Sequence, residues 1–374
     1  MISLLNPILK ATTIKYSKEI TMNKFIYILL SMFLIIGMSA EMNAGNPDRQ
    51  GEAGGGQLLL NPWARSAGLH TMTTSFVSGV EANVLNPAGI VRINKSEFVV
   101  AHTRYLEGTD IGFNAFGLAQ RTGKNGAFGL SIMLVDMGDI PVTTESQPEG
   151  TGATFSPSFF NMGISYSHIF DEKISVGLTF RIVSESTADI SAFGMAIDAG
   201  VQYVTGPEDN FKFGISLRNI GTPMRYSGQG LDVAAPNPNV AEFGYTLTYA
   251  QRSQKYELPS VLNIGLSYDF VINPKNRLTV VGNFTSNSFS QDQLGGGIEY
   301  SFNNMFMLRG GYKYEFGSTE NNGEEAAVYS GLSGGFSIQV PLKKDSNNFF
   351  GIDYAYRATR VWNGSHNIAV RFAF

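Results

Sequence analysis

The feature that most constrains this fold is a series of segments in which apolar residues alternate with small or polar ones. In the last nine residues, Ile368, Val370, Phe372 and Phe374 share one register, and the intervening positions are small or polar. Because side chains alternate across a β-strand, this segment would have one apolar face. A terminal phenylalanine is typical of the strand that closes an outer-membrane barrel, although a soluble β-sandwich can end in the same way.

The same alternation recurs along the chain from about residue 96. Ser175, Gly177, Thr179 and Arg181, for example, alternate with apolar neighbours. The runs are long enough for tilted strands that cross a bilayer, whereas sandwich strands are shorter. Polar-face glycines also favour a barrel. We predict about fourteen strands, at 96–105, 111–121, 125–135, 158–169, 172–184, 190–204, 209–219, 258–270, 276–286, 291–302, 305–316, 327–341, 348–358 and 366–374.

The predicted connections alternate in length. Every second one is a short turn, such as Asp171–Glu172 or Asn303–Asn304, and the others include 136–157, 220–257 and 317–326. Bacterial barrels have an even number of strands, short periplasmic turns and long external loops. The sequence therefore predicts an all-β protein, a transmembrane antiparallel β-barrel of the outer membrane over residues 95–374, with both termini in the periplasm and lipid around it.

Composition excludes several classes of protein. Charged residues make up 16% of the chain, below the quarter that is usual for soluble domains. The net charge of -4, without a lysine or arginine run, argues against nucleic acid as a partner. Cysteine is absent, which excludes disulfides, thiol catalysis and a lipobox anchor.

The amino end has the features of a signal peptide, which we predict over residues 1–44. Lys24 precedes an apolar run from Phe25 to Gly37, and small residues follow at Ser39–Ala40 and at Ala44. Met22 is a possible true start. The apolar run is too short to favour a membrane helix.

Residues 45–94 are predicted to form a plug inside the barrel. The stretch 58–93 is less strand-like, and Asn86 and Pro87 are typical of a turn or the start of a helix. Short helices or turns would then fill the lumen, with Asn86, Pro87 and Ala88 as plug or gate residues. The alternative is that this stretch caps the barrel surface.

Charged residues recur on the polar register of the predicted strands. Such charges usually pair with one another around a plug or a column of water, and contact with a substrate is the alternative. The predicted lumen charge network consists of Arg181, Asp198, Arg218, Asp269, Glu299, Arg309, Asp353, Arg357 and Arg371.

The motifs that would indicate catalysis or a cofactor fail in their context. Gly331–Gly335 matches the G-x-S-x-G nucleophile elbow, but a strand follows it where the elbow needs a helix. The four histidines are dispersed, without metal-ligand spacing. We therefore predict no catalytic residue, no metal, no cofactor and no enzymatic activity.

Several of these segments, taken in order, resemble the PorV/PorQ family of Bacteroidetes outer-membrane proteins. The segments are Asn61–Gly68, Asn86–Gly89, Leu294–Tyr300, Leu308–Tyr312 and Ser365–His366. These proteins are relatives of the FadL-type barrels, and the resemblance implies fourteen strands with an amino-terminal hatch. It also implies a role in type IX secretion, in which family members carry or anchor secreted proteins.

Two functions follow as hypotheses. In the first, a barrel without enzymatic activity binds secreted or surface proteins through loops 136–157 and 220–257. In the second, a FadL-like barrel passes a hydrophobic ligand across the outer membrane. A transporter should have an apolar pocket beneath the external loops and a gap or kink in its wall, whereas a scaffold should associate with proteins.

Overall fold

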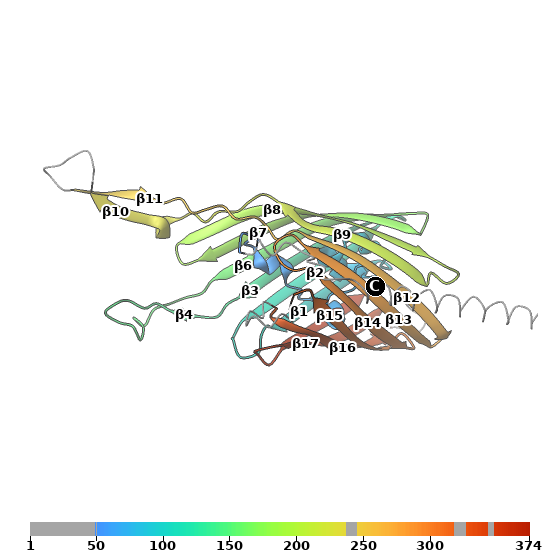
Figure 1. Cartoon of the computed structure of the whole chain (residues 1–374). Coiled ribbons are helices and arrows are strands. Elements are labelled where there is room, and N and C mark those ends of the chain that lie inside the picture. The colour runs from blue at the N-terminus through green and yellow to red at the C-terminus, as the bar shows by residue number, and fades with distance from the viewer. Residues whose placement is uncertain (1–48, 50, 237–244, 318–326, 343–347) are drawn as a thin grey trace, which may run out of the picture. The chain divides into compact units, whose positions relative to one another are not determined.

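Fourteen antiparallel strands close into one barrel in the computed structural model, which describes residues 49, 51–236, 245–317, 327–342 and 348–374 (Figure 1). Strands pair in the order of the sequence, and β1 pairs with β18 to close the cylinder. The predicted all-β barrel is thus confirmed. Its strands are β1 (Ser96–Arg104), β2 (Gly112–Thr122), β3 (Gly126–Asp136), β6 (Ser158–Phe170), β7 (Ile174–Thr187), β8 (Ile190–Thr205), β9 (Phe211–Gly221), β12 (Val261–Asn273), β13 (Asn276–Asn287), β14 (Gln293–Phe302), β15 (Phe306–Glu315), β16 (Tyr329–Pro341), β17 (Phe349–Thr359) and β18 (Ser365–Ala373).

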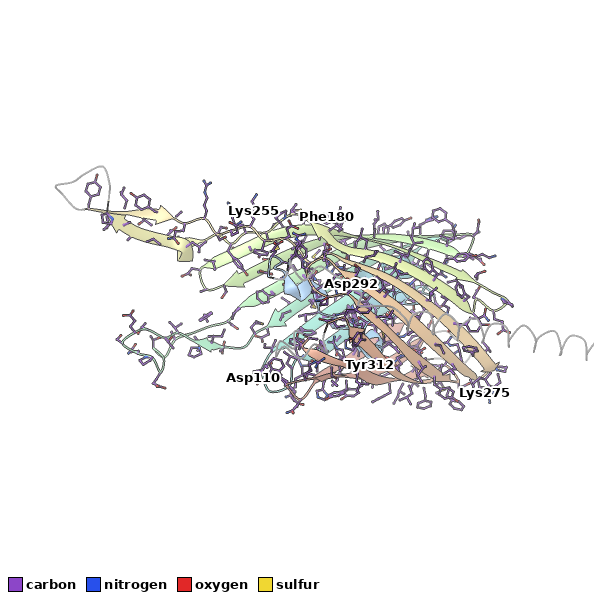
Figure 2. All side chains as sticks on the ribbon, in the orientation of Figure 1. Asp110, Phe180, Lys255, Lys275, Asp292 and Tyr312 are labelled. Atoms are coloured by element: carbon purple, nitrogen blue, oxygen red, sulfur yellow. The ribbon has the colours of Figure 1, made fainter. Side chains whose placement is uncertain are left out.

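The alternation in the sequence corresponds to the two faces of the wall. On β7, Leu178 is 59% exposed, whereas the next residue, Thr179, is fully buried. Such outward apolar side chains cover the barrel (Figure 2), as a lipid-facing surface requires. Strand ends differ from the prediction by a few residues. β7 continues to Thr187 because it forms a tight hairpin with β8 around Ala188, whose φ is 45°.

The two ends of the barrel carry different connections. The turns β2–β3, β6–β7, β8–β9, β12–β13 and β14–β15, together with the chain end at Phe374, lie at one end, which we call the turn rim. The long connections lie at the other end, the loop rim, which also carries the tight β7–β8 hairpin. Each of the two longest contains a small hairpin, namely β4 (Ile140–Pro141) with β5 (Thr154–Phe155) and β10 (Asp232–Pro236) with β11 (Thr246–Ala250). Both hairpins extend beyond the wall, at the left of Figure 1.

The residues before β1 fold into short helical pieces inside the barrel, as the prediction of a plug requires. They are η2 (Gly56–Leu59), α2 (Ala64–Ala67), η3 (Gly79–Glu81), α3 (Ala82–Leu85) and η4 (Pro87–Gly89). In the part of the chain that the structure describes, no helix is both long and apolar enough to span a membrane. The predicted signal peptide, residues 1–44, lies outside the described residues, so that assignment stays a prediction.

The plug runs from the loop rim to the turn rim. Near its start, Ala53 pairs with Glu257, which lies in the β9–β12 connection, and it ends where Ser96 pairs with Phe374. The main hydrophobic core lies between the plug and the first strands, around the fully buried Trp63 and Phe113. Burial of this apolar surface holds the plug against the wall.

Candidate functional site

Inward-facing glycines allow the plug to approach the wall closely. A Cβ atom at Gly177 would overlap the backbone of Pro87, one at Gly200 would overlap the side chain of Asn86, and one at Gly214 would overlap the backbone of Thr74. Only glycine permits such an approach. Added Cβ atoms would also meet plug residues at Gly117, Gly129, Gly265, Gly297 and Gly335. We call this set of inward glycines the glycine seat.

The predicted gate residues Asn86, Pro87 and Ala88 are fully buried against the glycine seat. Asn86 Nδ2 donates to the carbonyl of Thr74 at 2.8 Å and to that of Val201 at 3.2 Å, and its Oδ1 accepts from the Ala88 amide at 3.2 Å. Ser167 Oγ donates to the Ala88 carbonyl at 3.0 Å. The segment is therefore held on both sides, by the plug and by the wall.

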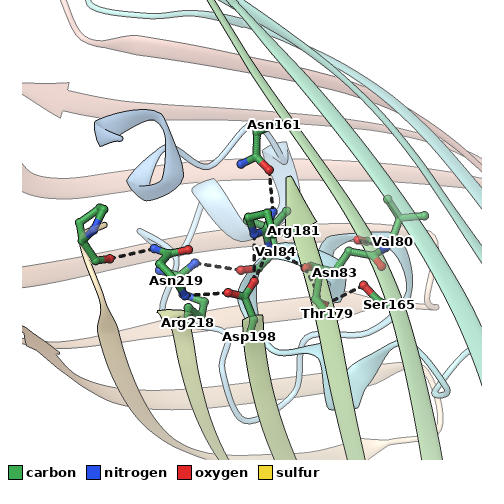
Figure 3. A network of polar contacts seen from close by, with 11 residues as sticks. Val80, Asn83, Val84, Asn161, Ser165, Thr179, Arg181, Asp198, Arg218 and Asn219 are labelled. Carbon is green, nitrogen blue, oxygen red and sulfur yellow. Dashed lines mark hydrogen bonds and ion pairs between the residues drawn. The ribbon is translucent and has the colours of Figure 1, made fainter. Parts of the chain in front are cut away.

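A first charge network joins β6 to β9 and the plug (Figure 3). The guanidinium of Arg181 pairs with Asp198 and donates to Asn161 Oδ1 at 3.0 Å and to the plug carbonyl of Asn83 at 3.1 Å. The second oxygen of Asp198 accepts from the Asn219 amide at 2.7 Å. Because every charge here is paired, the network can remain ionised in the buried lumen.

A second network follows the wall from β13 to β18. Glu299 pairs with Arg309 and, at 3.5 Å, with Arg277. Arg309 Nη1 donates to Ser337 Oγ at 2.6 Å, and Ser337 donates to Asp353, which pairs with Arg371. Cation and anion alternate along this belt, so the charges satisfy one another.

Three of the predicted network residues have other partners. Asp269 pairs with Lys212 at 2.6 Å, and Arg218 Nη1 donates to the plug carbonyl of Val84 at 2.9 Å. Arg357 lies over the ring of Tyr329, 4.6 Å from its centroid. Among the described residues, Arg218 and Arg357 thus lack a carboxylate partner, unlike the other predicted cations.

Sequence reasoning missed two buried glutamates, one that ties the plug to the wall and one that joins two parts of the plug. Glu97 Oε1 of β1 accepts from the Val80 amide at 2.9 Å, and Glu81 Oε2 accepts from the Ser66 amide at 3.1 Å. Both side chains are buried. Glu97 follows the inward register of its strand, which could have indicated it, whereas Glu81 stands alone among apolar residues.

A cavity of about 320 Å³ opens beneath the loop rim, between the plug and the wall. The plug contributes Asn61, His70 and Thr71, and several strands contribute polar side chains such as Asn263 and Thr285. The adjoining wall is irregular. The ladder between β15 and β16 ends at the pair Tyr312–Leu332, although β15 continues to Glu315, and β16 bulges between Tyr329 and Ser333.

The serine of the rejected elbow motif lies within β16. Ser333 Oγ is close to the carbonyls of Gly68 and Gly311, at 3.2 Å and 3.4 Å. No group of three or more histidine, aspartate or glutamate residues that could hold a metal occurs in the described part of the chain.

Comparison with known proteins gives a family and a fold. Residues 148–372 match the family described as type IX secretion system membrane protein PorP/SprF. No curated protein sequence matches the chain. Because the matching family is PorP/SprF, the predicted PorV/PorQ membership is wrong. The segments on which it depended include plug turns and glycine-rich strands, which a plugged barrel needs whatever its family, so they did not separate one family from another.

Several solved structures share the fold. The toluene transporter TodX of Pseudomonas putida has a TM-score of 0.53 at 14% identity, covering 84% of this chain and 97% of TodX. The toluene transporter TbuX of Ralstonia pickettii has a TM-score of 0.53 at 13% identity, covering 84% and 99%. A Pseudomonas aeruginosa FadL homologue has a TM-score of 0.50 at 13% identity, covering 83% and 98%. The FadL-like fold is thus confirmed.

Proposed function

The chain belongs to the PorP/SprF family of type IX secretion system membrane proteins, and on this premise we propose that it is a scaffold without enzymatic activity in the outer membrane. In this proposal the loop rim faces outward and binds secreted or surface proteins, and the turn rim faces the periplasm. The contrast between long and short connections supports this orientation.

The exposed apolar face of the β10–β11 hairpin is the main support for this proposal. Val233 stands opposite Tyr249 and Ala235 opposite Leu247, so these four side chains share one face. Val233 is 41%, Leu247 38% and Tyr249 41% exposed. An isolated two-stranded hairpin is only marginally stable in water, and an uncovered apolar face on it is typical of a surface that a protein partner covers.

The base of this hairpin is anchored to the barrel. Tyr226 and Tyr256 both donate to Glu185 Oε2, at 2.6 Å and 2.8 Å, and Ser227 pairs with Ser191 of β8. Burial raises the pKa of the Tyr226 phenol to about 12, so the phenol keeps its donor proton at neutral pH. The hairpin thus projects from a fixed point, which suits a surface that presents a strand edge or an apolar face to a partner.

Removal of the hairpin should abolish capture of secreted proteins. Deleting 232–250 is suitable because the Gln251 amide already donates to the Leu231 carbonyl at 3.1 Å, so a two-glycine link closes the gap. Part of this segment, 237–244, lies outside the described residues. Affinity purification from native outer membranes, followed by mass spectrometry, should recover secreted proteins with the intact chain and not with the deletion.

A triple substitution tests the same surface without shortening the chain. Val233→Ser with Leu247→Ser and Tyr249→Ser removes the apolar face, whereas Ala234→Ser with Thr248→Ser alters the opposite face. We expect only the first to lose the partner, by tenfold or more in recovered protein, since about 1.5–3 kcal/mol accompanies burial of one large apolar side chain. Equal recovery with both variants would refute the scaffold proposal for this surface.

Passage of a hydrophobic molecule is the second candidate. It is supported by the fold shared with TodX and TbuX and by the bulge in β16 beside the cavity. The cavity lining, however, includes Asn263, Thr285 and Lys313, which suit a polar ligand better than a hydrocarbon. Uptake of radiolabelled toluene into vesicles that contain the protein would distinguish this candidate from the scaffold.

A further inference from the structure

The cavity beneath the loop rim is surrounded by positive charge that the described residues do not neutralise. Arg218 of β9, Lys313 of β15 and Arg357 of β17 reach it from three strands. Glu315 is the one carboxylate in the described lining, and it accepts from Gln293 Nε2 at 2.8 Å. None of the three cations forms an ion pair within the described part of the chain.

The hydrogen-bond donors of these cations are incompletely used. Arg357 is only 4% exposed, yet its Nε and Nη2 have no acceptor among the described residues, and the same holds for Arg218 Nε. Within the described ranges, Lys313 Nζ donates only to the hydroxyl of Thr71, at 3.4 Å. Several unused donors therefore converge on one space.

His70 of the plug adds a neutral donor to the same space. It is 5% exposed, neither ring nitrogen has a partner in the part of the chain that the structure describes, and its ring meets that of Tyr329 edge-on at 5.4 Å. Burial, with repulsion from Lys313 and Arg357, holds the pKa of the imidazole well below its usual range. The ring is therefore neutral and offers one N–H donor and one acceptor nitrogen.

The rest of the lumen shows how unusual this cluster is. Arg181, Arg309 and Arg371 are as buried as Arg357, and each pairs with a carboxylate. A buried cation without a counter-charge destabilises the folded chain, so Arg357, with the half-buried Arg218 and Lys313 beside the same cavity, points to a charge supplied from outside. The volume of about 320 Å³ lies at the lower end of small-molecule sites.

We propose that this cavity binds a small polar organic anion, whose carboxylate or phosphate lies between Arg357, Lys313 and Arg218 while His70 donates to it. Arginine suits this role because its planar donors match the two oxygens of such groups. Asn263, Thr285 and Asn287 provide hydrogen bonds for a polar body such as a sugar. The anion could be a soluble molecule that enters from the loop rim or a lipid headgroup that enters where the β15–β16 ladder ends.

Calorimetric titration of the purified full chain tests this site. Glucose 1-phosphate and glucuronate are the anionic probes, and glucose is the neutral probe of matched size. We expect saturable 1:1 binding of at least one anion and none of glucose. Arg357→Gln should weaken this binding by about tenfold or more, and Arg357→Lys should restore part of it. Arg104→Gln is the control, since Arg104 is exposed and lies outside the lining.

The same variants separate the two sources of the anion. A phosphorylated lipid that stays bound in native mass spectrometry of the wild type, and is lost in Arg357→Gln, identifies a headgroup. Saturable binding by lipid-free protein identifies a soluble ligand. Folding gives an independent check, because Arg357→Gln without ligand should resist urea at least as well as the wild type. The proposal is overturned if the protein retains no lipid and binds no anion saturably. It is also overturned if Arg357→Gln binds the anion as well as the wild type does.

Discussion

The Gly177→Ala variant should unfold at a clearly lower urea concentration than the wild-type protein after both are refolded into lipid vesicles. The new methyl group would overlap the backbone of Pro87, and backbone cannot rotate aside as a flexible side chain can. Overpacking of this kind costs about 1–3 kcal/mol. The plug segment is also tied there by Asn86 and Ser167, so the wall and the plug must both shift.

The same variant tests whether the plug closes the lumen. If strain at the glycine seat loosens the plug, Gly177→Ala should conduct ions in a planar bilayer more often than the wild type. Gly282→Ala is the matched control, because a Cβ atom at that outward position meets nothing within 4 Å. A Gly177→Ala protein as stable and as closed as Gly282→Ala would show that the plug does not depend on this close approach.

The sequence could predict the wall of the barrel much better than its interior. Alternation fixes which side chains of β7 face lipid, because one step along a strand reverses the face, so Arg181 and Gly177 could be placed inside from the pattern alone. The even strand count and the alternation of short and long connections then followed.

Pairing inside the barrel could not be predicted in the same way. Which cation meets which carboxylate depends on strand stagger and on the path of the plug. Arg218, for example, was predicted to belong to the charge network, but it donates to the carbonyl of Val84. The plug contact of Glu97 depends in the same way on where Val80 comes to lie. The PorV/PorQ prediction failed because the segments behind it are plug turns and glycine-rich strands, which any plugged barrel needs.

Replacement of Asp198 by leucine should be the most destabilising single change in the lumen. It leaves Arg181 buried without its counter-charge and deprives the Asn219 amide of its acceptor (Figure 3). Loss of one partner from a buried pair costs about 3–5 kcal/mol. The measurement is the free energy of unfolding in urea, again in lipid vesicles. Arg104→Gln, which breaks a pair with Glu107 at the loop rim, should cost under about 1 kcal/mol, because Arg104 is 67% exposed.

A double-mutant cycle separates two contributions to the free energy of unfolding. One is the cost of leaving Arg181 without a counter-charge, and the other is the net contribution of the Arg181–Asp198 pair. Arg181→Met combined with Asp198→Leu removes both charges, so the double variant should be more stable than Asp198→Leu alone. Arg181 also donates to Asn161 and to the Asn83 carbonyl of the plug, so part of the loss will remain. If the double variant is no more stable than Asp198→Leu, the aspartate acts mainly through Asn219, and the first network holds the wall through that backbone contact instead of through charge.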